Sequence, residues 1–153
     1  IFKLPIARVA ERAAVVPGTD GRKMSKSARN TIELFASDAE VRQQIMGIRT
    51  DSTPLESPKP IDNALYGLLA LMAPPGDFAQ FDLSWRTGGK GYAEYKKLLL
   101  EYFHARFDAA RQRREELRRD PGEVERILVD GARRAREMAT PIMERARRAA
   151  GIR

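Results

Sequence analysis

The segment YAEYKKLLLEYFHARFDAARQRREELRR, residues 92–119, contains neither glycine nor proline. Its apolar side chains recur at helical spacing and form one stripe, made up of Tyr95, Leu98, Leu99, Tyr102, Ala105 and Ala109. Such a stripe predicts a long helix that turns one face toward a hydrophobic core. Residues 92–119 therefore favour a mainly α-helical fold, and the segments on either side extend the pattern.

A second helix is predicted directly after the first. In DPGE, residues 120–123, Asp120 suits an N-cap, Pro121 the first helical position and Glu123 the third. Apolar residues follow at helical spacing: Val124, Ile127, Leu128, Ala132, Ala135, Met138, Ala139 and Ile142. Pro141 lacks the backbone N–H that a helix interior requires, so we expect the helix to kink or end there.

Shorter helices are predicted on the amino-terminal side. IDNALYGLLALMA, residues 61–73, is apolar on nearly every face, which is typical of a buried helix. Residues 77–85 lie between two glycine-containing breaks and fit a short helix. Farther upstream, Ser37 and Glu40 have the spacing of a capping box and predict a helix start. Together these segments predict a helical bundle with short connections.

A proline-rich connector, RTDSTPLESPKP at residues 49–60, divides the chain. Its prolines should make it stiff, and we place a domain boundary within it. The predicted domains are residues 1–53 and 54–153. The first opens with IFKL, residues 1–4, which fits a short strand. Because the chain begins with Ile1 rather than methionine, we expect it to be a piece of a longer protein.

The composition limits the classes of function. Hydrophobic residues make up 42% and charged residues 32% of the 153 residues, which is typical of a folded, soluble chain. A formal net charge of +7 favours a polyanionic partner such as nucleic acid or a nucleotide. The sequence has no cysteine, which excludes disulfides and thiolate zinc sites and favours the cytoplasm. The longest apolar run, residues 64–73, is too short for a membrane span of about 20 residues.

The segment GRKMSKSARN, residues 21–30, places two lysines and two serines within five consecutive residues. Proline and glycine just before it favour a loop. Ammonium and hydroxyl groups can contact the crowded phosphates of a nucleoside triphosphate. Contacts that tighten as pyrophosphate departs would lower the barrier to its release. From the spacing alone, a solvated basic turn remains an open alternative.

The sequence KMSKS at residues 23–27 is identical to the second signature of class I aminoacyl-tRNA synthetases. PGTDGRKMSKS, followed by Asn30 and Ile32, resembles the form that this signature takes in tryptophanyl-tRNA synthetases. Further elements of that family are resembled, in the same order, by RTDS (49–52), GGKGYAEYKKLLLEYF (88–103) and GARRAREMATPIMERARRAAGIR (131–153). The resemblance therefore covers nearly the whole chain.

The resemblance implies a particular fold and activity. Residues 1–53 would be the end of a Rossmann-type catalytic domain, with the short strand and the KMSKS loop. Residues 54–153 would form an α-helical anticodon-binding domain. The parent enzyme would be an ATP-dependent ligase that activates L-tryptophan, releases pyrophosphate and passes the aminoacyl group to tRNA(Trp). ATP with Mg²⁺ would be a substrate, and neither a tightly bound prosthetic group nor a protein metal site is expected.

The matching ATP-binding positions are Lys23, Met24, Ser25, Lys26 and Ser27. Lys26 is expected to stabilise the departing pyrophosphate as the first catalytic residue, and Lys23 to support it as the second. Ser25 would donate a hydrogen bond to phosphate, and the backbone near Met24 would face adenine. For the Met24 side chain, a role as a hydrophobic latch of the loop remains open.

The sequence also departs from the family pattern. Ala28, followed by Arg29, stands where the family often has an aromatic residue, and Pro141 interrupts a helix that the family keeps smooth. The other class I signature, His-Ile-Gly-His, is missing, since His104 is the one histidine. We expect His104 to have a packing or surface role. The tryptophan pocket and most of the ATP site would lie in an amino-terminal half that this chain lacks, so the chain alone is expected to be inactive.

Arginines crowd the two long predicted helices. The resemblance makes four of them candidates for contacting tRNA phosphates: Arg111, Arg114, Arg133 and Arg136. Interleaved glutamates favour a salt-bridged, solvated surface as the alternative. The role of Trp85, beside Arg86 at a chain break, stays open between a core and a stacking position.

Three hypotheses follow from these observations. The first, which we favour, is the carboxy-terminal half of a tryptophanyl-tRNA synthetase. The related tyrosine-specific synthetase shares the fold and the loop and is the second. The third is a non-catalytic RNA-binding or regulatory paralogue that kept the loop. For the parent enzyme we expect a cytoplasmic homodimer that does not contact membranes.

Overall fold

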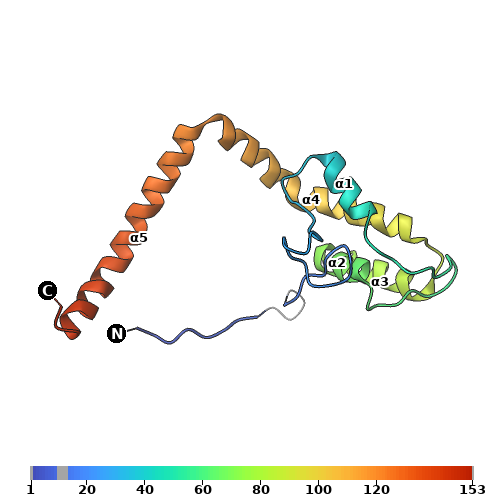
Figure 1. The fold of residues 1–153 in the computed structure, drawn as a ribbon, viewed down its shortest axis with the longest axis horizontal. Coiled ribbons are helices and arrows are strands. Elements are labelled where there is room, and N and C mark those ends of the chain that lie inside the picture. Colours follow the sequence, from blue (N-terminus) through green and yellow to red (C-terminus); the bar gives the residue numbers. More distant parts are fainter. Residues whose placement is uncertain (1, 10–13, 153) are drawn as a thin grey trace. The chain divides into compact units, whose positions relative to one another are not determined.

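The structure is a computed structural model that describes residues 2–9 and 14–152 (Figure 1). Within these residues it contains five helices and almost no strand, which confirms the mainly helical fold. The contacts divide the chain into two compact units. One unit is Val9–Arg111, and the other combines Gln112–Arg153 with Ile1–Arg8. The predicted boundary at residues 53 and 54 falls inside the first unit and remains a prediction.

Helix α1 spans Asp38–Met46 and begins at the predicted capping box. The Ser37 hydroxyl accepts a hydrogen bond from the Glu40 backbone N–H, and the Glu40 carboxylate accepts one from the Ser37 N–H at 2.9 Å. These bonds satisfy backbone donors that the first turn would otherwise leave unpaired. Val41 and Ile45 turn into the core, which fixes the face that α1 presents to the other helices.

Helices α2 (Ala64–Met72), α3 (Phe78–Thr87) and α4 (Tyr92–Arg119) supply the rest of the core. Helix α2 begins at Ala64 rather than at residue 61, because the Asn63 side chain caps it by accepting from the Leu65 N–H. Helix α4 has the bounds that the sequence predicts. Together with α1 and the part of α4 up to Arg111, helices α2 and α3 pack as a bundle in the first unit.

Trp85 occupies the centre of this core and has no exposed surface. Its ring lies 4.6 Å from that of Tyr95 and 5.5 Å from that of Tyr66, measured between centroids. The indole N–H donates to the Pro60 carbonyl oxygen at 3.1 Å. These contacts decide the question that the sequence leaves open, since Trp85 packs in the core and is not available for stacking on a base.

The connector at residues 49–60 is held against the start of α4. The Tyr92 hydroxyl donates to the Asp51 carboxylate at 2.8 Å, and burial followed by this bond raises the pKa of Tyr92 to about 12. Lys59 is buried, and its ammonium group lies 5.4 Å from the centre of the Tyr92 ring. Asp51 belongs to the RTDS segment, whose role here is to tie the connector to α4.

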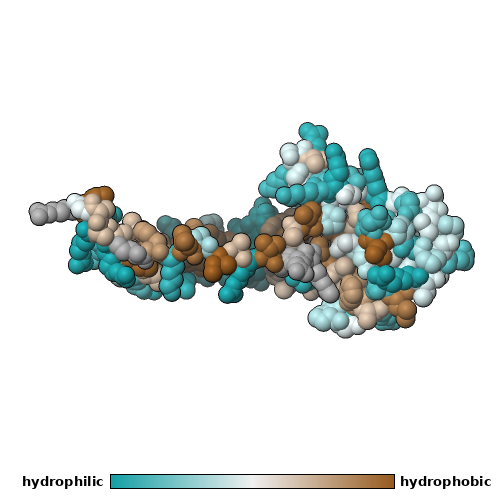
Figure 2. All heavy atoms as spheres, turned by 90° about the horizontal axis from the view of Figure 1, so that it is seen from below, coloured by the Kyte–Doolittle hydropathy of each residue, from teal (hydrophilic) through white to brown (hydrophobic). Residues whose placement is uncertain are grey.

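Helix α5 spans Pro121–Ala149 and begins as predicted, because the Asp120 side chain accepts from the Glu123 N–H at 3.0 Å. Of the two outcomes predicted for Pro141, an end of the helix is wrong, since the helix continues through this residue, and a kink stays a prediction. The proline costs one backbone hydrogen bond, which the bonds before and after it outweigh. Helix α5 has no buried residue, and Figure 2 shows apolar and hydrophilic side chains together along it.

The strand predicted at residues 1–4 does not form in the described part of that segment. Residues 2–9 have no regular secondary structure. A strand needs a neighbouring strand to accept and donate its backbone hydrogen bonds, and residues 2–4 have no such neighbour within the described chain. Among the described helices, none is both long enough and apolar enough to cross a membrane.

Candidate phosphate-binding loop

A tight turn forms the base of the KMSKS loop. Pro17 pairs with Lys23 in an antiparallel bridge, and the Met24 N–H donates to the Val16 carbonyl at 2.8 Å. Between them, the Gly18 N–H donates to the Arg22 carbonyl at 2.6 Å. The chain therefore reverses direction between Pro17 and Lys23. These bonds fix the base from which the rest of the lysine-serine motif projects.

The side chain of Asn30 fills the inside of this turn and is 2% exposed. Its Oδ1 accepts from the Ser25 N–H at 2.8 Å. Its Nδ2 donates to the Asp20 carboxylate at 2.7 Å and to the Lys23 carbonyl at 3.1 Å. One amide group thus binds three separate points of the loop.

Gly18 lies against this amide. A Cβ atom at Gly18 would overlap the side chain of Asn30, including its Nδ2. Position 18 therefore requires glycine for a steric reason, because the backbone must pass close to a buried side chain. The sequence shows a glycine here but cannot show what it touches.

We expect Gly18→Ala to destabilise the protein by about 1–3 kcal/mol, because the added methyl group overpacks the turn around Asn30. Urea unfolding followed by circular dichroism measures this free energy. Gly76→Ala is the matched control, since a Cβ at Gly76 meets nothing within 4 Å. An equal effect of both substitutions would contradict the steric argument.

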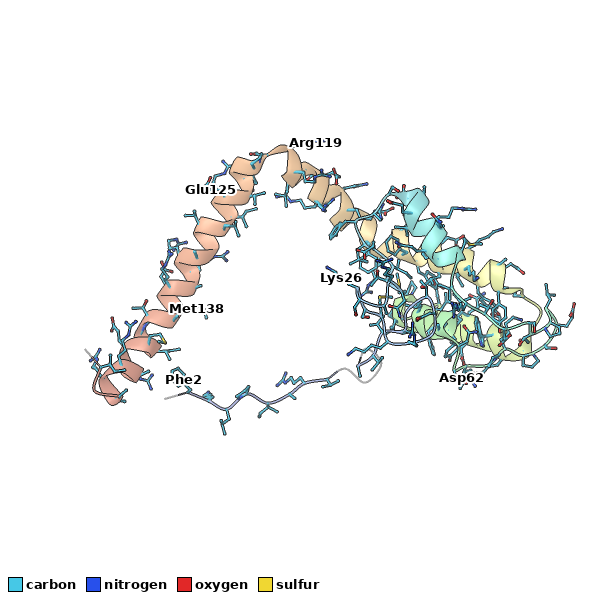
Figure 3. The ribbon with its side chains drawn as sticks, in the orientation of Figure 1. Phe2, Lys26, Asp62, Arg119, Glu125 and Met138 are labelled. Carbon is cyan, nitrogen blue, oxygen red and sulfur yellow. The ribbon has the colours of Figure 1, made fainter. Side chains whose placement is uncertain are left out.

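The tip of the loop carries the motif side chains. Lys23, Lys26 and Ser27 are exposed, and Figure 3 shows Lys26 at the edge of its unit. The Ser25 Oγ accepts from the Ala28 N–H at 3.2 Å and lies 3.3 Å from the Ser27 Oγ. Two ammonium groups and two hydroxyls therefore project from one short turn, where phosphate oxygens can reach them.

Met24 differs from the other motif residues. Its side chain is partly buried and packs against the hydrophobic core, together with that of Ile32. This packing supports the alternative role of Met24 as a hydrophobic latch. The backbone at Met24 stays available for a ligand only through its carbonyl, because its N–H already donates to Val16.

An open hollow of about 780 Å³ lies beside the loop. Its lining includes Lys26 and Arg29 together with Glu33 and Glu40. The two acidic side chains would repel a phosphate bound in this hollow. The exposed tip of the loop is therefore the better place for an anion than the hollow itself.

Asp20 is the acidic group nearest the base of the loop. The hydrogen bond from Asn30, followed by that from Arg22, lowers the pKa of Asp20 from 3.8 to about 2. Arg22 lies 2.7 Å from the Asp20 carboxylate, so the local negative charge is paired. An unpaired carboxylate here would oppose phosphate binding at the tip.

The lowered pKa of Asp20 predicts a pH dependence of stability. The ionised form stabilises the fold, and this contribution is present above the unfolded value of 3.8 and disappears as pH falls toward about 2. We therefore expect the difference in melting temperature between the wild type and Asp20→Asn to shrink between pH 4 and pH 2. A difference that stays constant over this range would contradict the assignment.

The four candidate tRNA-binding arginines have different surroundings. Arg111 donates to the carbonyl oxygens of Leu34 and Ala36, and it pairs with Asp38. Its guanidinium thereby joins α4 to the chain before α1, which is a structural role. Contacts to tRNA phosphates stay a prediction for all four.

The other three candidates lie farther along α4 and α5. Arg133 pairs with Asp130 and Glu137, and Arg114 pairs with Glu115, as expected for a salt-bridged surface. Arg136 is exposed. His104, which the sequence places outside catalysis, is partly exposed and lies 3.0 Å from the Asp108 carboxylate.

Almost the entire chain can be aligned with known proteins. No family model matches it. A tryptophan–tRNA ligase of Rhodopirellula baltica is 47% identical over 153 residues, which is 99% of this chain and 48% of that protein. The chain is a homologue of the tryptophan–tRNA ligases. The corresponding ligase of Campylobacter jejuni is 41% identical over 95% of this chain and 46% of its own length.

A solved structure of a tryptophan–tRNA ligase agrees with this assignment. The crystal structure of the Campylobacter jejuni tryptophanyl-tRNA synthetase, complexed with ADP and tryptophan, matches with a TM-score of 0.77 at 39% identity. The match covers 99% of this chain and 48% of that one, in its carboxy-terminal part. The chain thus spans about half the length of the relatives that it matches.

Sequence reasoning found the motif but missed its support. The quoted segments contain Gly18, Asp20 and Asn30, but sequence reasoning gives none of them a part in holding the loop. A signal was present, since the side chain of an asparagine near a tight turn often binds the free backbone groups of that turn. Only the structure shows that these three residues form one cluster.

Proposed function

We propose that this chain is the carboxy-terminal half of a tryptophan–tRNA ligase and supplies its mobile phosphate-binding loop. The observation that carries the proposal is the 47% identity to such a ligase over 99% of this chain. The KMSKS loop supports it, because two exposed lysines lie beside two serine hydroxyls on a base that hydrogen bonds hold in place.

In the proposed reaction, the carboxylate of L-tryptophan attacks the α-phosphate of ATP, which enters with Mg²⁺, and pyrophosphate leaves. The oxygen that bridges the α- and β-phosphates gains negative charge as its bond to the α-phosphorus breaks. Lys26 places an ammonium group where it can follow this charge, and Lys23 adds a second. Ser25 and Ser27 donate hydrogen bonds to phosphate oxygens. The aminoacyl group then passes to the terminal ribose of tRNA(Trp).

The helices after the connector are proposed to contact the anticodon region of tRNA(Trp). Arg114, Arg133 and Arg136 remain candidates for phosphate contacts. Arg111 is a weaker candidate than the sequence indicates, because two carbonyl oxygens and Asp38 already occupy its guanidinium. We further propose that the parent enzyme is a cytoplasmic homodimer.

Amino-acid-dependent ATP–pyrophosphate exchange tests this function. The full-length protein that contains this chain should exchange with tryptophan and with neither tyrosine nor any other amino acid. The 153-residue chain alone should be silent, because the expected tryptophan pocket lies outside it. Exchange with tyrosine would favour the related synthetase. A full-length protein that is inactive with every amino acid would favour the non-catalytic RNA-binding paralogue.

A further inference from the structure

Asn30 makes three side-chain hydrogen bonds to the KMSKS loop and its base. An asparagine side chain offers one acceptor oxygen and two N–H donors. The oxygen accepts from Ser25, and the two donors serve Asp20 and Lys23. Because the carboxylate of Asp20 can only accept, it fixes which way the amide points. The orientation of Asn30 is therefore determined by its partners.

The two backbone partners of Asn30 lie on either side of Met24. The Lys23 carbonyl and the Ser25 N–H both bind the amide, so the backbone directions before and after Met24 are set together. A second bond extends the arrangement, since the Thr19 N–H donates to the Asn30 carbonyl at 2.9 Å. The first half of the motif is thus held by the side chain and the backbone of one residue.

The second half of the motif is held at its far end. The Arg29 N–H donates to the Lys26 carbonyl at 3.1 Å, and Arg29 adopts a left-handed conformation with φ at 52°. A residue with a Cβ keeps such a conformation only where its surroundings impose it. Arg29 leads directly into Asn30, whose side chain is held by its bonds to Ser25, Asp20 and Lys23. Lys26, Ser27 and Ala28 form a short exposed span between two fixed points.

We propose that Asn30 is a positioning residue that sets the backbone of the KMSKS loop so that Lys26 reaches the departing pyrophosphate. The inference rests on the proposed function for its catalytic part. Asn30 itself touches no substrate in this scheme. It acts through the backbone of Lys23 and Ser25, and misplacing a charged group by about 1 Å can cost a hundredfold in rate.

Trypsin cleavage tests the positioning without any assumption about activity. Trypsin cuts after lysine and arginine, so mass spectrometry of the fragments is needed to identify the cuts at the bonds after Lys23 and Lys26, which report how firmly the loop is held. In the full-length protein, Asn30→Ala should be cut at these bonds at least fivefold faster than the wild type. The matched control is Asn63→Ala, which also removes a side-chain bond to a backbone N–H, at the start of α2. Its cleavage at these bonds should stay within twofold of the wild type, and wild-type cleavage of Asn30→Ala would overturn the proposal.

Exchange kinetics test the catalytic consequence. Asn30→Asp keeps the acceptor for Ser25, loses both donors and places a second carboxylate beside Asp20. For Asn30→Asp and Asn30→Ala, kcat for ATP–pyrophosphate exchange should fall at least tenfold, while KM for tryptophan stays within twofold. Asn63→Ala should keep the wild-type kcat, and every kcat is measured at a temperature at which circular dichroism shows that all the variants are folded.

Two results would overturn the catalytic part. One is an unchanged kcat in both Asn30 variants. The other is a fall in kcat that is proportional to the fall in melting temperature across the variants, or that comes with an equal rise in KM for tryptophan. Either pattern would indicate that the substitution disturbs the whole fold. A wild-type protein that shows no exchange with tryptophan would overturn the proposed function, whereas trypsin cleavage would still decide whether Asn30 holds the loop.

Discussion

Replacing Lys26 with alanine is expected to slow tryptophan-dependent ATP–pyrophosphate exchange by about a hundredfold, or about 3 kcal/mol of transition-state stabilisation. The ammonium group is exposed at the tip of a loop whose base is fixed, so a phosphate can reach it. Its contact strengthens as negative charge develops on pyrophosphate, and the loss should therefore fall on kcat more than on KM for tryptophan.

Lys97→Ala is the matched control for this substitution. Lys97 is an exposed lysine on α4 and does not belong to the loop, so the same change of charge should leave exchange within twofold of the wild type. Equal losses in both variants would indicate a general effect of net charge. Full activity of Lys26→Ala would remove Lys26 from the mechanism.

Trp85→Ala is expected to lower the free energy of unfolding by about 3–5 kcal/mol. The indole is completely buried among aromatic rings, and its N–H satisfies the carbonyl of Pro60. Removing it leaves a cavity and one carbonyl without its partner. Because the indole N–H holds the carbonyl of Pro60, the end of the connector at residues 49–60 should loosen along with the core.

Urea unfolding followed by circular dichroism measures this loss. Leu83→Ala on the same helix is the matched control, because Leu83 is 64% exposed. Its effect should stay within about 0.5 kcal/mol. A loss of less than about 1 kcal/mol for Trp85→Ala would mean that the indole does not form the centre of the core.

Local signals account for the helices that could be predicted. The bounds of α4 follow from a stretch without glycine or proline, and the starts of α1 and α5 follow from Ser37 and Asp120. A helix cap involves residues only three or four positions apart, so the sequence is enough to recognise it. The same local reasoning allowed the helix to end at Pro141, and it does not end there, because the remaining bonds of a long helix outweigh the one that proline removes.

Contacts between distant residues account for what could not be predicted. Arg111 is as basic as its neighbours in the sequence, yet it binds the chain before α1 across 75 residues. The position of Trp85 in the core depends on its contacts with Pro60 and Tyr95, which belong to other elements. No periodicity within a single helix carries this information, because it depends on how the helices pack.

The KMSKS loop shows the division most clearly. The sequence by itself determined the lysines and serines, the loop in which they lie and the resemblance to tryptophanyl-tRNA synthetases. Only the tertiary structure decided that Asn30 fills the turn, that Gly18 must leave room for it and that Asp20 orients it. The physical reason is that the chemical groups of a side chain depend on the residue type alone. Its burial and its hydrogen-bond partners arise only when separate parts of the chain come together.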